Sequence, residues 1–174
     1  RRFAQFKAKR INETFYTDTV VLKDQKKSIR GFQYVQIFVG KHSKFTYSYM
    51  MKLRSQVVDA LWQFLIDVGS PNTLFYDNSG EQDSEEWRQT CILNKIAMKH
   101  SEPYHQHQNR FESRIGDLKA RTLKILNTSG APSKYWCYAW ELATDIINVT
   151  ALKTFGWRTP YEVVHGDSPD ISPL

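Results

Sequence analysis

The sequence predicts a single α/β domain built on a five-stranded mixed sheet with helices on its flanks. Near the N-terminus, apolar and polar residues alternate with the period of a β-strand, and further along they recur with the period of a helix. The segments follow the order β-β-β-α-β-α-β, which indicates three antiparallel strands and then a βαβ arrangement. The 174 residues, of which 41% are apolar, are enough to bury the core of one domain of ordinary size.

The first three strands are expected to form an antiparallel meander. They span Thr14 to Leu22, Gln33 to Gly40 and Lys44 to Met51. In the first of them, Tyr16 and Asp18 fall on the same face. A carboxylate therefore interrupts an otherwise apolar row.

The next four segments alternate between helix and strand. Ser55 can cap a helix that ends at Gly69. Thr73 to Asp77 is short, aromatic and nearly continuous in its apolar character, as expected of a strand buried on both faces. A helix through Trp87 follows, and Lys95 to His100 supplies the fifth strand.

A long basic helix from Asn109 to about Asn127 comes next, and Glu112 is its unusual residue. The apolar stripe of this helix comprises Phe111, Ile115, Leu118, Thr122, Ile125 and Leu126. Glu112 and Lys119 lie along one edge of the stripe. A carboxylate at the edge of a core is costly unless a cation, a hydrogen-bond network or a metal compensates it.

Two further helices are expected after a break at residues 129–132. The first runs through Trp136 to Thr150, and its aromatic residues are expected to be buried. The second begins at Thr159, Pro160 and Glu162, which combine an N-cap, a proline in the first turn and a capping-box glutamate.

Composition and charge limit the classes of protein to which the chain can belong. We expect residues 1–13 to be a basic linker or arm, 14–168 the folded core domain and 169–174 a tail. The net charge of +6 and the pI near 9.3 favour a polyanionic partner, nucleic acid first. No apolar run approaches the ~18 residues that a membrane span needs. Cys91 and Cys137 form no C-x-x-C pattern, and we expect two buried, reduced thiols in an intracellular protein.

Three carboxylates stand where a strand or helix pattern would favour another residue: Asp18, Asp77 and Glu112. If the first and fourth strands are neighbours, Asp18 and Asp77 lie side by side, and the long helix can deliver Glu112. The negative charges of three such carboxylates would repel one another unless cations neutralised them. Mg²⁺ or Mn²⁺ fit best, because hard divalent ions favour oxygen ligands. Two of them about 3.5–4 Å apart can activate a water or hydroxyl and stabilise the leaving oxygen of an in-line phosphoryl transfer.

The residues around these acids form an ordered set of motifs. They are Thr17-Asp18, Tyr76-Asp77-Asn78, and Pro103-Tyr104 followed by Gln108-Asn109-Arg110-Phe111-Glu112; supporting blocks are Ser28-Ile29-Arg30-Gly31, Gly130-Ala131-Pro132 and Thr159-Pro160-Tyr161-Glu162. The set resembles the retroviral-type integrase catalytic core, an RNase H-like fold, and looks most like a copia-type LTR retrotransposon integrase. The resemblance covers nearly the whole chain.

The resemblance implies that Asp18, Asp77 and Glu112 are the catalytic residues and hold two Mg²⁺ or Mn²⁺ ions. It implies a polynucleotidyl transferase that inserts retroelement cDNA ends into target DNA by strand transfer and could also process 3′ ends. The partners would be double-stranded DNA and further copies of the chain, with Trp136 to Thr150 or the long helix as the interface. The implied location is a virus-like particle in the cytoplasm, then the nucleus.

Candidate DNA contacts gather on and before the long helix. They are Gln108, Asn109, Arg110, Arg114, Lys119, Arg121 and Lys124. The resemblance places Gln108 near the DNA end, Lys119 at a phosphate and Asn78 at a polar position beside Asp77. The basic residues either contact phosphate or form a solvated helix face, and the sequence leaves both open. The family motif often has glycine or a small residue after the asparagine, whereas Arg110-Phe111 is bulky here.

Two other functions fit the same motifs. The chain could be an RNase H-like nuclease or resolvase that only hydrolyses, with Asp117 or Asp24 as a fourth carboxylate. It could instead be a domesticated, catalytically silent core that binds DNA or another protein.

Overall fold

The computed structural model describes residues 9–21, 27–76, 82, 84–100 and 106–172, and only the backbone of 106–110. The strands in these ranges are β1 (Thr14–Val21), β2 (Tyr34–Gly40), β3 (Thr46–Met51), β4 (Thr73–Tyr76) and β5 (Ala97–His100). The α-helices are α1 (Val57–Asp67), α2 (Glu85–Leu93), α3 (Gln106–Ser129), α4 (Trp136–Asn148) and α5 (Pro160–His165). Short 3₁₀ turns, η1 (Arg54–Gln56), η2 (Ser133–Tyr135) and η3 (Lys153–Phe155), join them.

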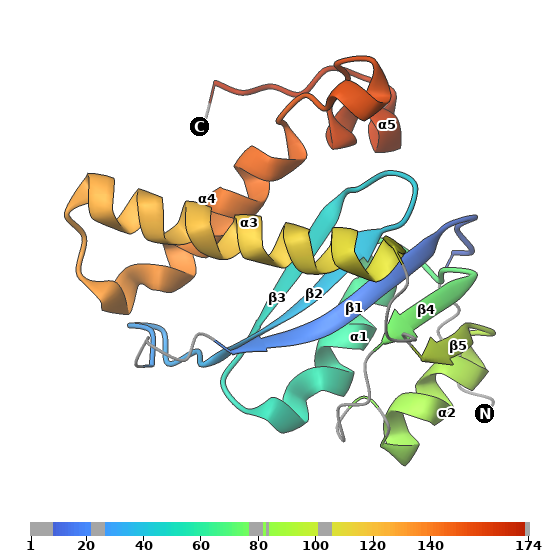
Figure 1. Cartoon of the computed structure of the whole chain (residues 1–174). Coiled ribbons are helices and arrows are strands. Elements are labelled where there is room, and N and C mark those ends of the chain that lie inside the picture. The colour runs from blue at the N-terminus through green and yellow to red at the C-terminus, as the bar shows by residue number, and fades with distance from the viewer. Residues whose placement is uncertain (1–8, 22–26, 77–81, 83, 101–105, 173–174) are drawn as a thin grey trace.

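The strands form one mixed sheet in the order β3-β2-β1-β4-β5 (Figure 1). The pairs β1–β2 and β2–β3 are antiparallel, whereas β1–β4 and β4–β5 are parallel. This topology confirms the predicted meander followed by a βαβ arrangement. It also makes β1 a central strand, paired on both sides.

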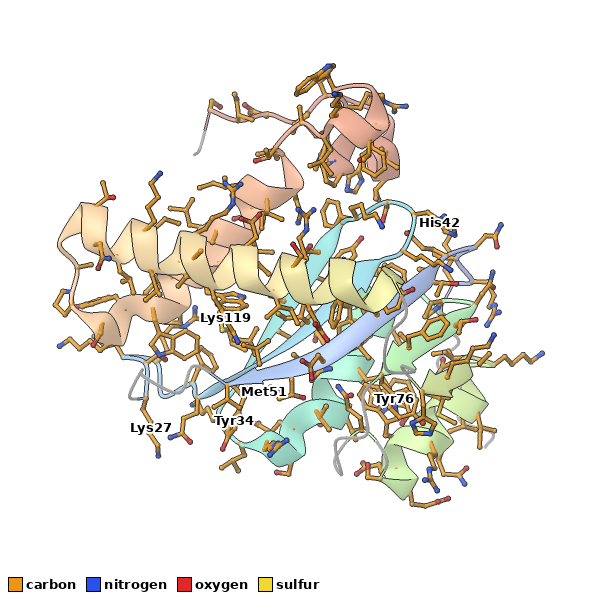
Figure 2. All side chains as sticks on the ribbon, in the orientation of Figure 1. Lys27, Tyr34, His42, Met51, Tyr76 and Lys119 are labelled. Carbon is orange, nitrogen blue, oxygen red and sulfur yellow. The ribbon has the colours of Figure 1, made fainter. Side chains whose placement is uncertain are left out.

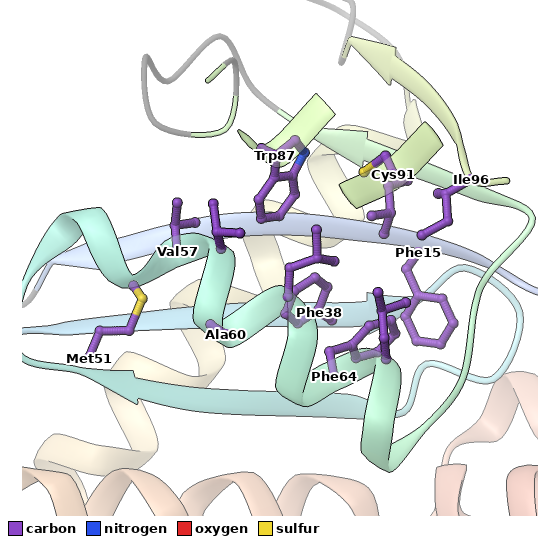
Figure 3. Close-up of a cluster of buried hydrophobic side chains, with 13 residues drawn as sticks. Phe15, Phe38, Met51, Val57, Ala60, Phe64, Trp87, Cys91 and Ile96 are labelled. Atoms are coloured by element: carbon purple, nitrogen blue, oxygen red, sulfur yellow. The ribbon is translucent and has the colours of Figure 1, made fainter. Parts of the chain in front are cut away.

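Helices cover the two faces of the sheet. On one face, α1 and α2 enclose a core that includes Phe15, Phe38, Phe64 and Trp87 (Figure 3). The rings of Phe38 and Phe64 stack with their centroids 4.2 Å apart. Cys91 belongs to this core, and both cysteines are buried free thiols, as the sequence predicts.

A second core lies on the opposite face, under α3 and α4. From β1 and β2 it draws Val20, Val35, Ile37 and Val39. The predicted stripe of α3 is confirmed, because Ile115, Leu118, Thr122 and Leu126 are buried, and Phe111 and Ile125 pack against the cluster. The predicted Trp-rich helix contributes Trp136, Ala139, Trp140, Ala143 and Ile147.

Two local predictions are wrong. Ser55 does not cap α1, whose N-cap is Gln56. The side-chain oxygen of Gln56 accepts hydrogen bonds from the Lys52 and Leu53 amides, so the chain enters α1 through η1. Nor is β4 buried on both faces: Leu74 is buried but Phe75 only half-buried, because the second core draws its strand residues from β1 and β2.

The ends of the described chain are also held. The side chain of Arg10 donates hydrogen bonds to the carbonyl of Lys95 at 2.7 Å and to Asn72 Oδ1 at 2.9 Å. At the other end, Thr159 and Glu162 form the predicted capping box of α5. Among the described residues, no helix is both long and apolar enough to cross a membrane.

Candidate active site

Asp18 stands on the face of the sheet that α3 covers. It pairs with Ile37 of β2, a residue of the second core, and shares its face with Tyr16 and Val20. The Asp18 side chain is half-buried, and its Oδ1 accepts a hydrogen bond from the Thr19 amide at 2.7 Å. A carboxylate is therefore held at a fixed position in a central strand, as the alternation of β1 predicts.

A buried amide fixes the strand on both sides of Asp18. Gln36 of β2 is fully buried on the opposite face of the sheet. Its Nε2 donates to Thr17 Oγ1 at 2.6 Å, and its Oε1 accepts from Thr19 Oγ1 at 2.6 Å. The two threonines flank Asp18 in sequence. This network was not predicted, although the polar Gln36 on a strand next to the Asp18 strand was a usable signal.

The end of β4 lies beside the same part of β1. The parallel register of the two strands ends with Thr17 opposite Tyr76. The Tyr76 side chain, labelled in Figure 2, is buried, and its hydroxyl lies 3.4 Å from His100 Nε2 on β5. Asp77 and Asn78 follow Tyr76 in the sequence and lie outside the described residues.

The first turns of α3 carry Glu112 over this face. Glu112 is exposed, and the ring of the preceding Phe111 stacks on Tyr16 of β1 with a centroid separation of 5.8 Å. Tyr16 also stacks on Phe75 of β4, at 5.1 Å. Burial of Tyr16 raises the pKa of its phenol. These ring contacts, which were not predicted, join the elements on which Asp18 and Glu112 lie.

The core stripe of α3 separates its polar residues into two flanks. Glu112 and Lys119 lie on one side of Ile115 and Leu118, and Figure 2 labels Lys119 on this helix. Arg114 lies on the other side, where a groove of ≈720 Å³ runs between α3, the β2–β3 turn and the segment around Leu152. The carboxylate and the basic face of α3 are thus on different sides of the helix.

The predicted basic contacts have different surroundings. Arg114 is half-buried and donates to the Lys44 carbonyl at 2.9 Å, and burial lowers the pKa of its guanidinium. Arg121 forms an ion pair with Asp117 at 3.4 Å, whereas Lys124 is exposed. The side chains of Gln108, Asn109 and Arg110 lie outside the described part of the chain.

Within the described residues, no group of three or more His, Cys, Asp or Glu side chains is arranged to hold a metal ion. Of the three predicted ligands, Asp18 and Glu112 are among the described residues, and Asp77 is not. Both are oxygen donors of the kind that hard divalent cations favour.

Comparison with known sequences identifies related proteins. No family model matches the chain. The chain is 26% identical over 159 residues to the retrovirus-related Pol polyprotein from transposon RE2 of Arabidopsis thaliana, a match that covers 84% of the chain. It is 26% identical over 154 residues to the corresponding polyprotein from transposon RE1 of the same plant, over 83% of the chain. The chain spans about a tenth of the length of these relatives.

Solved structures show the same fold. The HTLV-2 integrase catalytic core domain in complex with magnesium has a TM-score of 0.68 and 18% identity, and the match covers 88% of this chain and 97% of that one. The catalytic core domain of BIV integrase gives a TM-score of 0.66 at 19% identity, over 86% and 91% of the two chains. A chain of the simian T-cell lymphotropic virus intasome, in complex with a PP2A regulatory subunit, gives 0.72 at 18% identity, over 97% of this chain and 63% of that one.

Proposed function

The chain is a homologue of retrovirus-related Pol polyproteins and has the fold of retroviral integrase catalytic cores, and we propose that it catalyses DNA strand transfer. In this proposal it is the catalytic core of a retrotransposon integrase. Its substrates are the ends of a retroelement cDNA and a target DNA duplex. The reaction is an in-line transfer in which a 3′ hydroxyl displaces a phosphodiester oxygen of the target strand; the same site can process the 3′ end with water as the nucleophile.

Asp18, Asp77 and Glu112 are the proposed catalytic residues and metal ligands. Asp18 fits this role because it projects a carboxylate from a central strand whose neighbours on that face are apolar or aromatic. An all-carboxylate donor set favours Mg²⁺ or Mn²⁺ over softer metals. When bound, a pair of such ions lowers the pKa of the attacking hydroxyl and neutralises charge on the leaving oxygen. The HTLV-2 core was crystallised in complex with magnesium.

The parallel pairing of β1 with β4 is the observation that carries the proposal. The register ends at Thr17 opposite Tyr76, and the residues that follow these two in the sequence are Asp18 and Asp77. Consecutive Cα atoms are ~3.8 Å apart and neighbouring strands ~4.8 Å apart, so this register supports Asp77 as the carboxylate next to Asp18. Contact between Phe111 and Tyr16 supports Glu112 as the third.

The remaining residues of the site bind and orient DNA in this proposal. Lys119 shares the Glu112 flank of α3 and is suited to a phosphate near the reacting end. Gln108, Asn109 and Arg110, just before Glu112, contact the same DNA segment, and Asn78 supports the Asp77 carboxylate. On the other flank, the exposed Lys124 and the ion-paired Arg121 offer contacts to more distant phosphates. Arg114 also stabilises the fold through its hydrogen bond to the Lys44 carbonyl.

The proposed assembly is a homo-oligomer on DNA, and the proposed location is a virus-like particle and then the nucleus. The HTLV-2 core was crystallised in dimeric and trimeric forms, and the simian viral chain is part of an intasome. On this chain, α4 exposes Tyr138, which is 50% accessible, and either α4 or α3 can supply the contact between copies.

A strand-transfer assay with a labelled duplex end and Mg²⁺ or Mn²⁺ tests the proposal. Joined products identify an integrase, cleaved products alone a hydrolytic nuclease, and the absence of both a core that only binds. Asp18→Asn, Asp77→Asn and Glu112→Gln are each expected to abolish joining, because each removes a charged oxygen ligand. Asp59→Asn on the exposed face of α1 is the matched control and should retain activity. Full joining activity in Asp77→Asn would refute the proposed metal site.

A further inference from the structure

Three aromatic rings form a continuous stack across β4, β1 and α3. Phe75 of β4 stacks on Tyr16 of β1 with centroids 5.1 Å apart and planes inclined by 25°. Tyr16 in turn stacks on Phe111 of α3, at 5.8 Å and 27°. Both separations lie in the range of favourable offset stacking. We call Phe75, Tyr16 and Phe111 the ring stack.

Each ring is close in sequence to one carboxylate. Tyr16 precedes Asp18 by two residues and, by strand alternation, lies on the same face of β1. Phe75 precedes Asp77 by two residues, and Phe111 immediately precedes Glu112. For Asp18 and Glu112 the backbone between ring and carboxylate is short, so the position of the ring constrains the position of the acid.

The ring stack also connects the sheet to the helix α3 that packs on it. Tyr16 is only 8% exposed, and Phe111 is half-buried and packs against the second core. Farther along α3, Leu118 and Leu126 hold the helix against α4 and the sheet, at a distance from Glu112 along the helix. Among the described residues of α3, Ile115 anchors the next turn in the second core, and Phe111 supplies the aromatic contact between the Glu112 turn and the strand that carries Asp18.

From this arrangement we infer that Tyr16 and Phe111 are positioning residues, which set the separation of the Asp18 and Glu112 carboxylates for divalent-cation binding. The inference rests on the proposed function. It gives a physical reason for the bulky residue at position 111: a smaller side chain there would leave Tyr16 stacked on Phe75 alone and would remove the ring contact between β1 and α3. Residues that orient metal ligands without touching the metal typically affect metal affinity by about 10–100-fold.

The test compares three variants of the whole chain. Phe111→Leu keeps an apolar side chain but removes the ring, and Phe111→Tyr keeps the ring. Phe45→Leu is the matched control, since Phe45 is also half-buried and has its centroid 4.7 Å from that of Tyr47, at the β2–β3 turn. Thermal unfolding followed by circular dichroism checks that all variants fold.

Two measurements report on positioning. Hydrogen exchange of the amides from Glu112 to Gly116 should become faster in Phe111→Leu, but not in Phe111→Tyr or Phe45→Leu. Mn²⁺ binding, measured from the EPR signal of free Mn²⁺, should weaken about tenfold in Phe111→Leu and less than about threefold in the other two variants.

The outcomes separate the two proposals. If Asp18→Asn and Asp77→Asn abolish Mn²⁺ binding while Phe111→Leu binds Mn²⁺ and exchanges its amides as the parent does, the ring stack has no positioning role and the metal site stands. If the carboxylate variants bind Mn²⁺ as well as the parent, or the parent binds none, the proposed metal site fails and the inference fails with it. Equal losses in Phe111→Leu and Phe45→Leu would show a general effect of stability and would also overturn the inference.

Discussion

Gln36 donates a hydrogen bond from Nε2 to the Thr17 hydroxyl at 2.6 Å, and both side chains are buried. The other end of the same amide accepts from Thr19 at 2.6 Å, so one side chain of β2 holds β1 on both sides of Asp18. Burial of an amide is costly unless its polar atoms are paired. Here the pairing secures the strand that presents the candidate carboxylate.

Gln36→Leu should therefore destabilise the chain by about 1–3 kcal/mol, because it leaves the buried Thr17 hydroxyl without its partner. The free energy of unfolding from urea titrations measures the effect. Gln63→Leu is the control: Gln63 is exposed and bonds Asp67 on the surface of α1, and its loss should cost less than about 0.5 kcal/mol. Equal stabilities of the two variants would show that the buried network adds nothing.

Arg114 and Lys124 should respond differently to removal of charge. Arg114→Met loses a part-buried charged hydrogen bond to the Lys44 carbonyl and should cost about 1–2 kcal/mol of stability. Lys124→Met should leave stability unchanged but lower the slope of log K against log[salt] for duplex DNA binding by about 0.9. Lys27→Met, on another exposed segment, should change neither quantity. An unchanged salt slope in Lys124→Met would remove Lys124 from the DNA contacts.

Tyr47 makes stability depend on alkaline pH. Burial, and then the charge of Glu13, raise the pKa of Tyr47 to about 12, from an ordinary value of 10.0. A pKa raised on folding stabilises the folded chain below the ordinary value, and this contribution is lost as the pH rises from 10 toward about 12. Urea unfolding at pH 8, 10, 11 and 12 should show the decline.

Tyr47→Phe should make that decline shallower without removing it, because the pKa of the half-buried Tyr49 is raised as well, by partial burial and by Asp67. Tyr138→Phe, which removes a hydroxyl from an exposed ring, should reproduce the decline of the parent chain. A Tyr47→Phe decline as steep as that of the parent would exclude Tyr47 as a contributor.

Glu162 makes the start of α5 sensitive to acid. The hydrogen bond from the Thr159 amide is the largest of several interactions that lower the pKa of Glu162. Because this pKa is lowered on folding, the contribution is complete above the ordinary value of 4.5 and is lost as the pH falls through the lower folded value. Amide chemical shifts of α5 should follow this titration. Glu162→Gln should abolish it, whereas Glu85→Gln in α2 should not.

The sequence predicted the features that depend on local periodicity. Alternation in β1 assigned Asp18 to the same face as Tyr16 and Val20, and the spacing of Ile115, Leu118 and Thr122 identified the buried side of α3. The capping box of α5 was equally predictable from the sequence, because all its groups lie within four residues. The order of the predicted segments indicated the mixed sheet, whereas the pairing of β1 with β4 was only a condition of the site hypothesis and is observed in the structure.

Features that depend on distant contacts could not be read from the sequence. The bond from Arg114 to the Lys44 carbonyl joins positions 70 apart, and no local pattern distinguishes Arg114 from an exposed arginine. The stacking of Tyr16 on Phe111 likewise depends on where α3 crosses the sheet. The prediction for Ser55 failed for a local reason instead: Ser55 lies inside η1, which immediately precedes α1 and whose start is bound by the Gln56 side chain.

The central place of β1 also determines when the candidate site can assemble during folding. Its antiparallel partner β2 follows after residues 22–33, whereas its parallel partner β4 follows only after β2, β3 and α1. Long-range pairings of this kind close large loops, which costs chain entropy and slows their formation. The edge at Thr17 and Tyr76 is therefore completed after the hairpin, and refolding should restore β1–β2 protection from hydrogen exchange before β1–β4 protection.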